Sequence, residues 1–411
     1  MPLAQSLPRL VLAVFLLLPA GILPRGQVQS DLPLVVFDPG HGWATESGDI
    51  DPGATSGDLV EKDITLDVAR YARTYLSRCP VDVFLTREGD DSSHTLSDLD
   101  DLVNARHPAL GVSIHVNSAD GNPSGAEAWY TVGGYDDAES QLLASLLSAG
   151  IAERLSIPDR GTQPETANRL GGLYIHDWHA PSALVEIGFL QGDADLLADR
   201  RPDFGRAIAQ SILMVLGLPV TCADAAVPIG AAIATYFPGN TTTVELSLRN
   251  DGLITWQPEA YTLANVHNPY GAASSYPLAQ AIPVGEEATW EIPATAPETP
   301  GVYRQIWQLR RGSEPVGSEV TVYLVVLPEG ARDLRDEIDR EIDDMRARGE
   351  QEIEALVRDL EQQAREWVQR EVERQVERRL SRYCPGSSVL VVGLLLGSAA
   401  RVSYRRRRPR K

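Results

Sequence analysis

Short apolar runs alternate with polar stretches through the first half of the chain, and three runs lead into residues that can bind or serve a metal. Each run has the length and the β-branched content of a buried strand. The runs and the residues after them are 34–37 before Asp38-Pro39-Gly40-His41-Gly42, 111–114 before His115, and 183–185 before Glu186. Open α/β sheets bind ligands beyond the carboxyl ends of their strands, so these side chains are expected to converge. The pattern predicts a metal-dependent hydrolase.

A helical pattern supplies a fourth candidate residue. Glu61 opens a stretch whose apolar residues recur at helical spacing, namely Ile64, Val68, Ala69, Ala72 and Leu76. Two imidazoles and one carboxylate are a typical catalytic zinc set, with the fourth coordination position left for water or substrate. We therefore expect His41, Glu61 and His115 to bind one Zn2+ ion, which lowers the pKa of bound water to about 7. Glu186 is expected to be the catalytic general acid and base.

Each of these residues also has a simpler interpretation. A histidine at a strand end is commonly a capping or hydrogen-bonded loop residue, and an acidic residue in a first helical turn is favoured by the helix dipole. Their joint occurrence favours a metal site, and an unpaired carboxylate at Glu186 would be costly to bury. His94, His107 and His179 lack such a context and are interpreted as surface residues.

At these residues the chain resembles the zinc-dependent N-acetylmuramoyl-L-alanine amidases, the cell-wall hydrolase family often called amidase 3. The motifs that carry the resemblance, in family order, are Asp38-Pro39-Gly40-His41-Gly42, Asp51-Pro52-Gly53-Ala54, Glu61-Lys62, Leu85-Thr86-Arg87, Ser113-Ile114-His115-Val116-Asn117 and Leu184-Val185-Glu186-Ile187-Gly188-Phe189. The resemblance covers residues 31–219. It implies that His41, Glu61 and His115 are the zinc ligands and Glu186 the catalytic carboxylate. The bond cut would be the amide between muramic acid and L-alanine of the stem peptide in peptidoglycan.

Several positions depart from the family pattern. Trp43 stands where a second glycine is usual, and an acidic insertion occupies residues 44–50. Leu99 and His176 stand where arginines are expected, and His176 is a weak candidate for a substrate contact. None of these departures removes a ligand, but each bears on substrate preference. No long insertion follows His115 of the kind that carries a blocking helix in some regulated family members.

An apolar segment lies near each end of the chain. In residues 1–30, Arg9 precedes a short, proline-interrupted apolar core, which indicates a signal peptide rather than a buried helix. Residues 386–404 come close to the roughly twenty residues that a bilayer requires, and the basic tail 405–411 follows. By the positive-inside rule this predicts a C-terminal transmembrane helix and a cytoplasmic tail. The protein is expected to be exported and anchored in the membrane of the cell envelope, with its catalytic domain outside the cytoplasm.

Residues 225–328 change to short alternating strands separated by Pro and Gly turns, which predicts a β-sandwich. Through Trp256, Trp290 and Trp307 the segment resembles the immunoglobulin-like four-tryptophan domain, with Leu246 in place of one tryptophan. Core packing accounts for these tryptophans more simply than ligand stacking. The resemblance implies binding or spacing without naming a partner.

Residues 329–383 are charged and almost free of glycine and proline, with an apolar stripe in an eleven-residue repeat. One helix of this length would rise about 80 Å. We interpret the segment as a coiled-coil stalk through which copies of the chain form a homo-oligomer, because the stripe needs a partner. A solitary charged helix, or one folded back on the sandwich, is the alternative.

The sequence contains three cysteines and leaves open which of them form disulfides. Cys79 follows the first helix and Cys222 the last helix of the amidase segment, so both are expected at the same end of the sheet. They form either a disulfide, which an oxidising compartment permits, or two buried thiols. Cys384 lies beside the apolar segment, where acylation or interchain pairing is open to it.

Composition and charge limit the function classes. With 43% hydrophobic and 23% charged residues the chain suits folded protein rather than disorder. Its net charge of −20 excludes an overall basic nucleic-acid binder. The sequence thus predicts an α/β catalytic domain with a mixed sheet flanked by helices over residues 31–222, followed by the all-β sandwich, the stalk and the anchor. Two rivals remain, a zinc hydrolase of another amide and a catalytically silent wall-binding or scaffolding protein.

Overall fold

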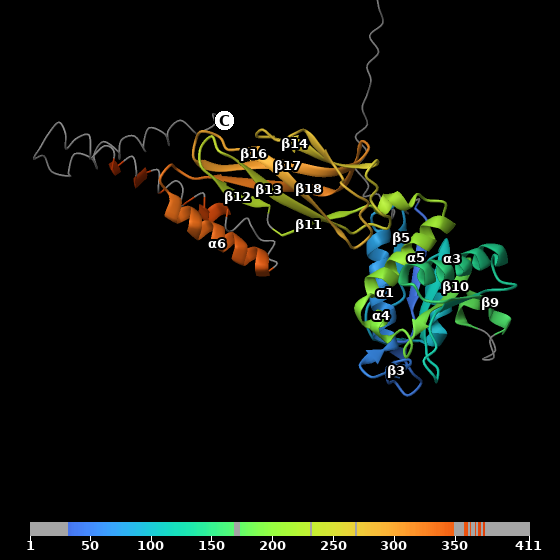
Figure 1. Cartoon of the computed structure of the whole chain (residues 1–411). Coiled ribbons are helices and arrows are strands. Elements are labelled where there is room, and N and C mark those ends of the chain that lie inside the picture. Colours follow the sequence, from blue (N-terminus) through green and yellow to red (C-terminus); the bar gives the residue numbers. More distant parts are fainter. Residues whose placement is uncertain are drawn as a thin grey trace, which may run out of the picture. The chain divides into compact units, whose positions relative to one another are not determined.

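The computed structural model describes residues 32–167, 173–230, 232–267, 269–348 and 357–360, with single residues as far as 374. The predicted signal peptide, the predicted transmembrane segment and the basic tail lie outside these residues. Within the described part, no helix is both long enough and apolar enough to cross a membrane. An α/β region and an all-β region follow one another along the chain (Figure 1).

A six-stranded mixed sheet forms the centre of the α/β region. Its strands are β1 (Leu34–Pro39), β5 (Asp82–Leu85), β7 (Leu110–Asn117), β8 (Ala126–Tyr130), β9 (Asp159–Pro164) and β10 (Ser182–Phe189). They are ordered β5-β1-β7-β10-β8-β9, and only the pair β10 and β8 is antiparallel. The three strands expected from the apolar runs, β1, β7 and β10, are neighbours. The prediction of an α/β catalytic domain with a mixed sheet is confirmed.

Helices cover the two faces of this sheet unequally. On one face, α1 (Glu61–Leu76), α3 (Asp137–Leu155), α4 (Ala194–Asp199) and α5 (Arg201–Val215) share a large apolar core with the strands. The other face carries α2 (Leu99–Asn104) and the 3-10 helix η3 (Tyr174–Asp177), which contribute to a smaller core. Because side chains alternate along a strand, Val35 and Phe37 enter the large core and Val36 the small one.

The remaining elements of this region are short. They are β2 (Trp43–Ala44), β3 (Thr55–Ser56), β4 (Leu59–Val60), β6 (Asp91–Thr95), η1 (Leu96–Asp98), η2 (Glu165–Ala167) and η4 (Val220–Ala223). The hairpin of β3 and β4 leads directly into α1. Acidic side chains in the first turn of α1 complement the helix dipole, and Ile64, Val68 and Ala72 bury the face that meets the sheet.

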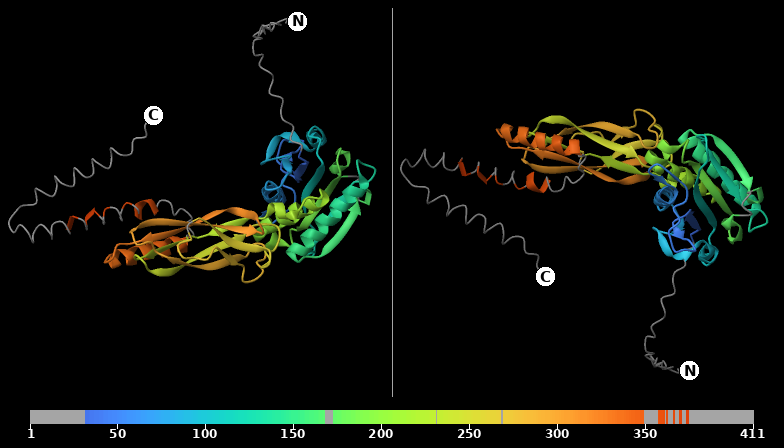
Figure 2. Two further views of the ribbon diagram at one scale, coloured as in Figure 1. Left: turned by 90° about the horizontal axis from the view of Figure 1, so that it is seen from above. Right: turned by 90° about the horizontal axis from the view of Figure 1, so that it is seen from below.

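The all-β region consists of two sheets that share one apolar core (Figure 2). Its strands are β11 (Ala226–Ile229), β12 (Ile233–Tyr236), β13 (Thr241–Asn250), β14 (Tyr261–His267), β15 (Ser275–Pro277), β16 (Glu287–Thr295), β17 (Gly301–Arg311) and β18 (Glu314–Val326). The sheet orders are β11-β13-β16 and β12-β18-β17-β14-β15. Trp256, Trp290 and Trp307 are all buried in the shared core, which confirms that they serve packing.

The predicted stalk begins with α6 (Arg332–Arg348), which lies against the all-β region. Ile338 and Ile342 of its apolar stripe are buried in a cluster with Ile233, which also contains Val357 and Leu360. These members of the stripe therefore have partners within their own chain. At these positions the contacts agree with the alternative of a helix folded back on the sandwich, and formation of a homo-oligomer through the stalk stays a prediction. The other residues of the stripe up to 383 lie largely outside the described part of the chain.

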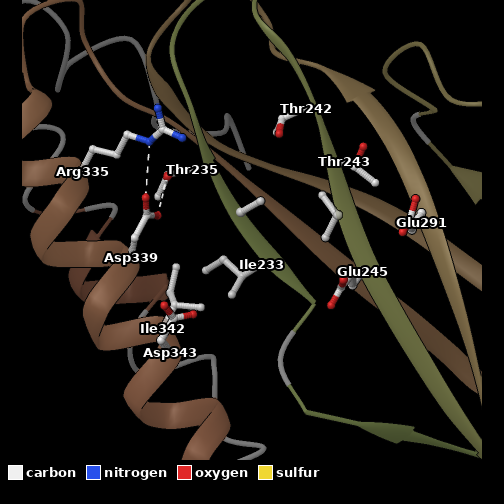
Figure 3. Close-up of a pocket in the computed structure, with 12 residues that line it drawn as sticks. Ile233, Thr235, Thr242, Thr243, Glu245, Glu291, Arg335, Asp339, Ile342 and Asp343 are labelled. Atoms are coloured by element: carbon white, nitrogen blue, oxygen red, sulfur yellow. Dashed lines mark hydrogen bonds and ion pairs between the residues drawn. The ribbon is translucent and has the colours of Figure 1, made fainter.

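A groove of about 490 Å3 separates α6 from β12 and β13 (Figure 3). Asp339 of α6 bridges its two sides, since it accepts a hydrogen bond from Thr235 of β12 at 2.5 Å; Arg335, on the same helix, also donates to it at 3.3 Å. Glu245 and Glu291 stand opposite each other in the pair β13 and β16 and also line the groove. The lining contains neither histidine nor cysteine, and it shares no residue with the site described below.

A disulfide joins Cys79, just after α1, to Cys222 in η4, so the pairing left open by the sequence is resolved. Its two cysteines are 143 residues apart in sequence. We expect the variant Cys79→Ser/Cys222→Ser to lose about 2–5 kcal/mol of unfolding free energy, because a long loop is no longer closed in the unfolded chain. Chemical denaturation measures the loss, and Cys384→Ser is the matched control. Equal stability of the two variants would show that the bond does not stabilise the fold.

Candidate metal centre

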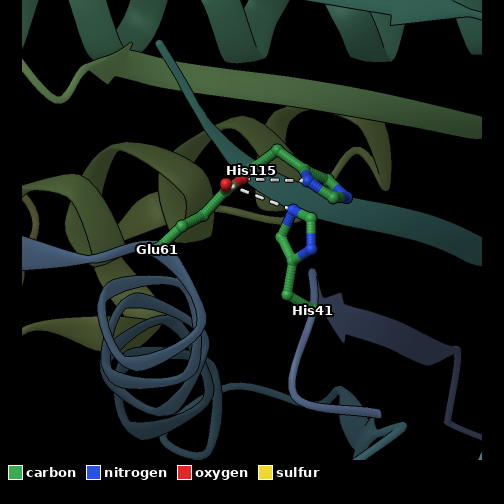
Figure 4. Close-up of side chains that lie close together, drawn as sticks. All are labelled: His41, Glu61 and His115. Carbon is green, nitrogen blue, oxygen red and sulfur yellow. Dashed lines mark hydrogen bonds and ion pairs between the residues drawn. The ribbon is translucent and has the colours of Figure 1, made fainter. Parts of the chain in front are cut away.

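Three segments that are distant in sequence bring His41, Glu61 and His115 together (Figure 4). His41 lies in the loop after β1 with a φ angle of 64°, a left-handed conformation that is uncommon outside glycine. Glu61 is the first residue of α1, and His115 belongs to β7. Each residue offers one ligand atom, and these atoms all lie within 4.8 Å of one another.

The Glu61 carboxylate stands between the two imidazoles. Its Oε2 lies 3.1 Å from His41 Nε2, and its Oε1 lies 3.1 Å from His115 Nδ1. Backbone N–H groups of Ala54 and Val116 also donate to it, at 2.9 and 3.0 Å. Burial raises the pKa of Glu61, but the hydrogen bonds and charges of the two histidines outweigh burial and hold this pKa well below its usual range. The carboxylate is therefore ionised and surrounded by donors.

Asp51 orients His41 from the side away from Glu61. Its Oδ2 lies 2.7 Å from His41 Nδ1, and its Oδ1 accepts from the Gly53 N–H at 2.9 Å. Burial lowers the pKa of His41, while Glu61 and Asp51 together raise it to about 9. Carboxylates that hold the second nitrogen of a metal-binding histidine commonly orient the ring. The sequence placed Asp51 in a motif without assigning it this role.

Gly53 makes the close approach of these groups possible. Its φ angle is 67°, and a Cβ atom there would lie 2.6 Å from the His41 ring and 2.7 Å from Glu61 Oε2. Any side chain at this position would push the histidine and the glutamate apart. The Asp-Pro-Gly-Ala motif therefore shapes the site with its backbone.

Glu186 lies beside His115 in the parallel pair of β10 and β7. Its Oε2 atom is buried and has no hydrogen-bond partner among the described residues. Burial, reinforced by the charges of Glu61 and Glu127, raises the pKa of Glu186 to about 7. A carboxylate in this state can both accept and return a proton near neutral pH.

Arg87 ties the segments that carry the site to each other. It is only 3% exposed and donates to the carbonyl oxygens of Pro39, Gly40 and Lys62, at 2.8, 3.1 and 2.7 Å. The first two carbonyls precede His41, and the third follows Glu61. This single guanidinium therefore joins the end of β1 to the start of α1.

The other histidines lie elsewhere. His94 pairs with Asp91 at 2.8 Å, and His107 and His179 are exposed, in keeping with their interpretation as surface residues. His176 is half exposed and pairs with the buried Glu165 at 2.6 Å, so its candidate role as a substrate contact stays a prediction. Trp43 and Leu99 are both buried in the small core, where they pack rather than face a ligand.

The donor set fits a divalent cation. Tetrahedral zinc with ligands at 2.0–2.2 Å separates its ligand atoms by about 3.4 Å, so small side-chain rotations from the present arrangement suffice. Two imidazoles and one carboxylate are the donor types of catalytic zinc sites. The orphaned Oε2 of Glu186 next to the set is a further polar group that needs a partner.

The α/β segment of the chain is similar in sequence to known proteins. The family described as N-acetylmuramoyl-L-alanine amidase matches residues 35–216. The germination-specific N-acetylmuramoyl-L-alanine amidase of Bacillus subtilis is 31% identical over 194 residues, covering 44% of this chain and 76% of that protein. The LytC amidase of the same organism is 31% identical over 183 residues, 43% of this chain and 34% of that protein. A solved N-acetylmuramoyl-L-alanine amidase from Clostridium difficile 630 has 27% identity and a TM-score of 0.40, covering 46% of this chain and 98% of that one. The matched segment contains all four residues of the candidate site.

Replacement of Arg87 should destabilise the protein. We expect Arg87→Ala to lower the free energy of unfolding by about 2–4 kcal/mol, because buried carbonyl groups lose a charged donor. Denaturant titration followed by circular dichroism measures the change. Arg200→Ala, which removes an exposed guanidinium whose one ion pair among the described residues is with the nearby Asp203, is the matched control and should stay within about 0.5 kcal/mol. A loss at Arg87 no larger than at Arg200 would contradict the role of Arg87 as a link.

Proposed function

Since the chain belongs to the family of N-acetylmuramoyl-L-alanine amidases, we propose that it hydrolyses the amide bond between N-acetylmuramic acid and L-alanine of the peptidoglycan stem peptide. The observation that carries the proposal is the cluster of His41, Glu61 and His115, with Glu186 adjacent to His115 in the sheet. The arrangement combines three metal-binding donors with a carboxylate that can move a proton. This is the combination that metal-assisted amide hydrolysis requires.

We assign one Zn2+ ion to His41, Glu61 and His115, with Asp51 orienting His41. When bound there, zinc would act as a Lewis acid on the amide carbonyl and as the activator of a water molecule. The ionised Glu61 and the neutral forms of the two histidines are the states that bind a cation. Neighbouring carboxylates raise the pKa values of both histidines and so favour their protonated forms, and zinc binding would release those protons.

Glu186 performs the proton transfers in this proposal. Its Oε2, which has no hydrogen-bond partner in the part of the chain that the structure describes, accepts a proton from the water that attacks the carbonyl carbon. As the carbon–nitrogen bond breaks, Glu186 returns that proton to the departing nitrogen of L-alanine. The products are a muramic acid carboxylate and a free amino group, so atoms and charge balance. A pKa near 7 lets the same carboxyl group serve in both directions.

We propose that the protein works in the cell envelope, outside the cytoplasm. Peptidoglycan is found there, and a stable disulfide such as Cys79–Cys222 fits an oxidising compartment. Residues 386–404 would anchor the chain in the membrane, although they lie outside the described residues. We propose that residues 225–328, two sheets around one apolar core, are an immunoglobulin-like module that binds a partner or spaces the enzyme from the anchor. Association of two copies through residues beyond 360 stays a prediction.

The activity is tested by mass spectrometry of purified peptidoglycan after digestion by the protein. We expect free stem peptides that begin with L-alanine, lost with a chelator and restored by zinc. Glu186→Gln, which keeps the shape but cannot accept a proton, should lower kcat by about 100- to 10,000-fold. His179→Gln, an exposed histidine outside the site, is the control and should keep full activity.

Other products would identify the alternatives. Cleavage within peptides that carry no sugar would favour a hydrolase of another amide. Binding to peptidoglycan without release of any peptide, and with zinc in place, would favour the wall-binding or scaffolding protein. Either result would contradict the proposed function.

The zinc content of variants distinguishes the three metal ligands from Glu186, which transfers protons. We expect one zinc ion per chain in the unaltered protein, and loss of that zinc in His41→Ala, Glu61→Gln and His115→Ala, because each removes one of three protein ligands. Glu186→Gln and His179→Gln should keep it. Elemental analysis of the dialysed proteins measures the ratio. Zinc retained in two of the three ligand variants would contradict the assigned set.

A further inference from the structure

Glu127 lies one strand beyond Glu186, on the same face of the sheet. The register pairs His115 with Glu186 across β7 and β10, and Glu186 with Glu127 across β10 and β8. Ala126 and Ala128 on either side of Glu127 are fully buried in the large core, so Glu127 points to the opposite face. Three chemically active side chains therefore stand in a row across three neighbouring strands.

Both oxygens of Glu127 are engaged. Its Oε1 accepts a hydrogen bond from Asn117 Nδ2 at 3.0 Å, and its Oε2 accepts from Arg160 Nε at 2.8 Å. Asn117 lies two residues after His115 on β7, and Arg160 lies on β9. Through this contact the row of side chains extends to a fourth strand, β9, and its last member is the positively charged Arg160.

Two further contacts hold the Arg160 side chain in place. Its guanidinium carbon lies 4.9 Å from the centre of the Phe189 ring. Its aliphatic part lies over Gly125, where a Cβ atom would come within 3.0 Å of the Arg160 Cγ and Cδ atoms. A side chain held at both its stem and its head has already lost much of the rotamer freedom that ligand binding would otherwise restrict.

The free part of the guanidinium can bind an anion. The Arg160 side chain is 41% exposed, and among the described residues only its Nε has a hydrogen-bond partner. The two Nη groups form the fork that matches a carboxylate with two parallel hydrogen bonds. Because the chain as a whole carries a net charge of −20, an anionic substrate needs such a local cation near the reaction centre.

The separation of Arg160 from Glu186 suits the length of two residues of the stem peptide. Arg160 is two strand spacings from Glu186, which is about 10 Å. An extended chain advances about 3.3–3.6 Å per residue, so the second residue after the cut bond reaches about 7 Å from it, and the Arg160 side chain, which turns back toward Glu127, covers the remainder. In muramyl peptides that residue is a D-glutamate with a free α-carboxylate, or its amidated form D-isoglutamine.

We propose that Arg160, held by Glu127, is a substrate-positioning residue that binds the α-carboxylate of the residue following L-alanine. The inference rests on the proposed amidase function and names one determinant of its specificity. The row from His115 to Arg160 then serves two purposes, with chemistry at one end and peptide recognition at the other.

The test compares two muramyl peptides of equal length, whose second stem residue is either D-glutamate or D-isoglutamine. One charged hydrogen-bond pair corresponds to about 10- to 100-fold in kcat/KM, so the unaltered protein should prefer the acid by this factor. Arg160→Gln should raise KM for the acid peptide, leave kcat nearly unchanged and abolish the preference. Arg160→Lys should retain part of it, because a point charge remains. Arg200→Gln is the matched control and should behave as the unaltered protein does.

Other results of this experiment would overturn either the inference alone or the proposed function as well. An equal loss on both peptides in Arg160→Gln, with unchanged zinc content and thermal unfolding, would show that Arg160 only holds Glu127 and would overturn the inference. No loss on either peptide would overturn it as well. If the unaltered protein cleaves neither peptide nor intact peptidoglycan, the proposed amidase function itself fails. If it cleaves both peptides equally, that function stands and only the inference fails.

Discussion

The buried carboxylate of Glu61 is the interaction on which the site depends. Its two oxygens meet two imidazoles and two backbone N–H groups, so each lone pair is used. An ionised group at this depth would be costly without positive charge on both sides. Because its partners come from the loop after β1, from β7 and from the residue before β3, they must all be in place before the charge is compensated. The carboxylate therefore couples the assembly of the α/β domain to the assembly of the site.

The two faces of the sheet have different roles. The face under α1, α3, α4 and α5 carries the large apolar core, and His115 and Glu186 project from the opposite face, which carries the smaller core. Val185 and Ile187 face the core while Glu186, between them, faces the site. Strand alternation allows adjacent residues to serve different purposes, since a change on one face does not displace a group on the other. Arg87 ties the end of β1 to the start of α1, so the segments that carry His41 and Glu61 keep their positions.

The sequence predicted the site better than its surroundings. The apolar runs located β1, β7 and β10, and the topology rule for strand ends correctly brought His41, His115 and Glu186 to one place. The sequence did not predict hydrogen bonds between distant residues. Those of Glu127 with Asn117 and Arg160 depend on the order of β8 and β9 in the sheet, and hydrophobic periodicity does not give this order. For the same reason the sequence left open what the stripe of the predicted stalk packs against. An amphipathic stripe shows that a partner is needed, and only the tertiary structure shows that the partner of Ile338 is the chain's own sheet.

Anomalous X-ray diffraction at the zinc absorption edge, from crystals of the protein grown with zinc, tests the central claim most directly. The account predicts one strong peak at about 2.0–2.2 Å from ligand atoms of His41, Glu61 and His115, with the Glu186 carboxylate beside it. A peak at other residues, or no peak while these three side chains keep their present positions, would contradict the assignment of the metal centre.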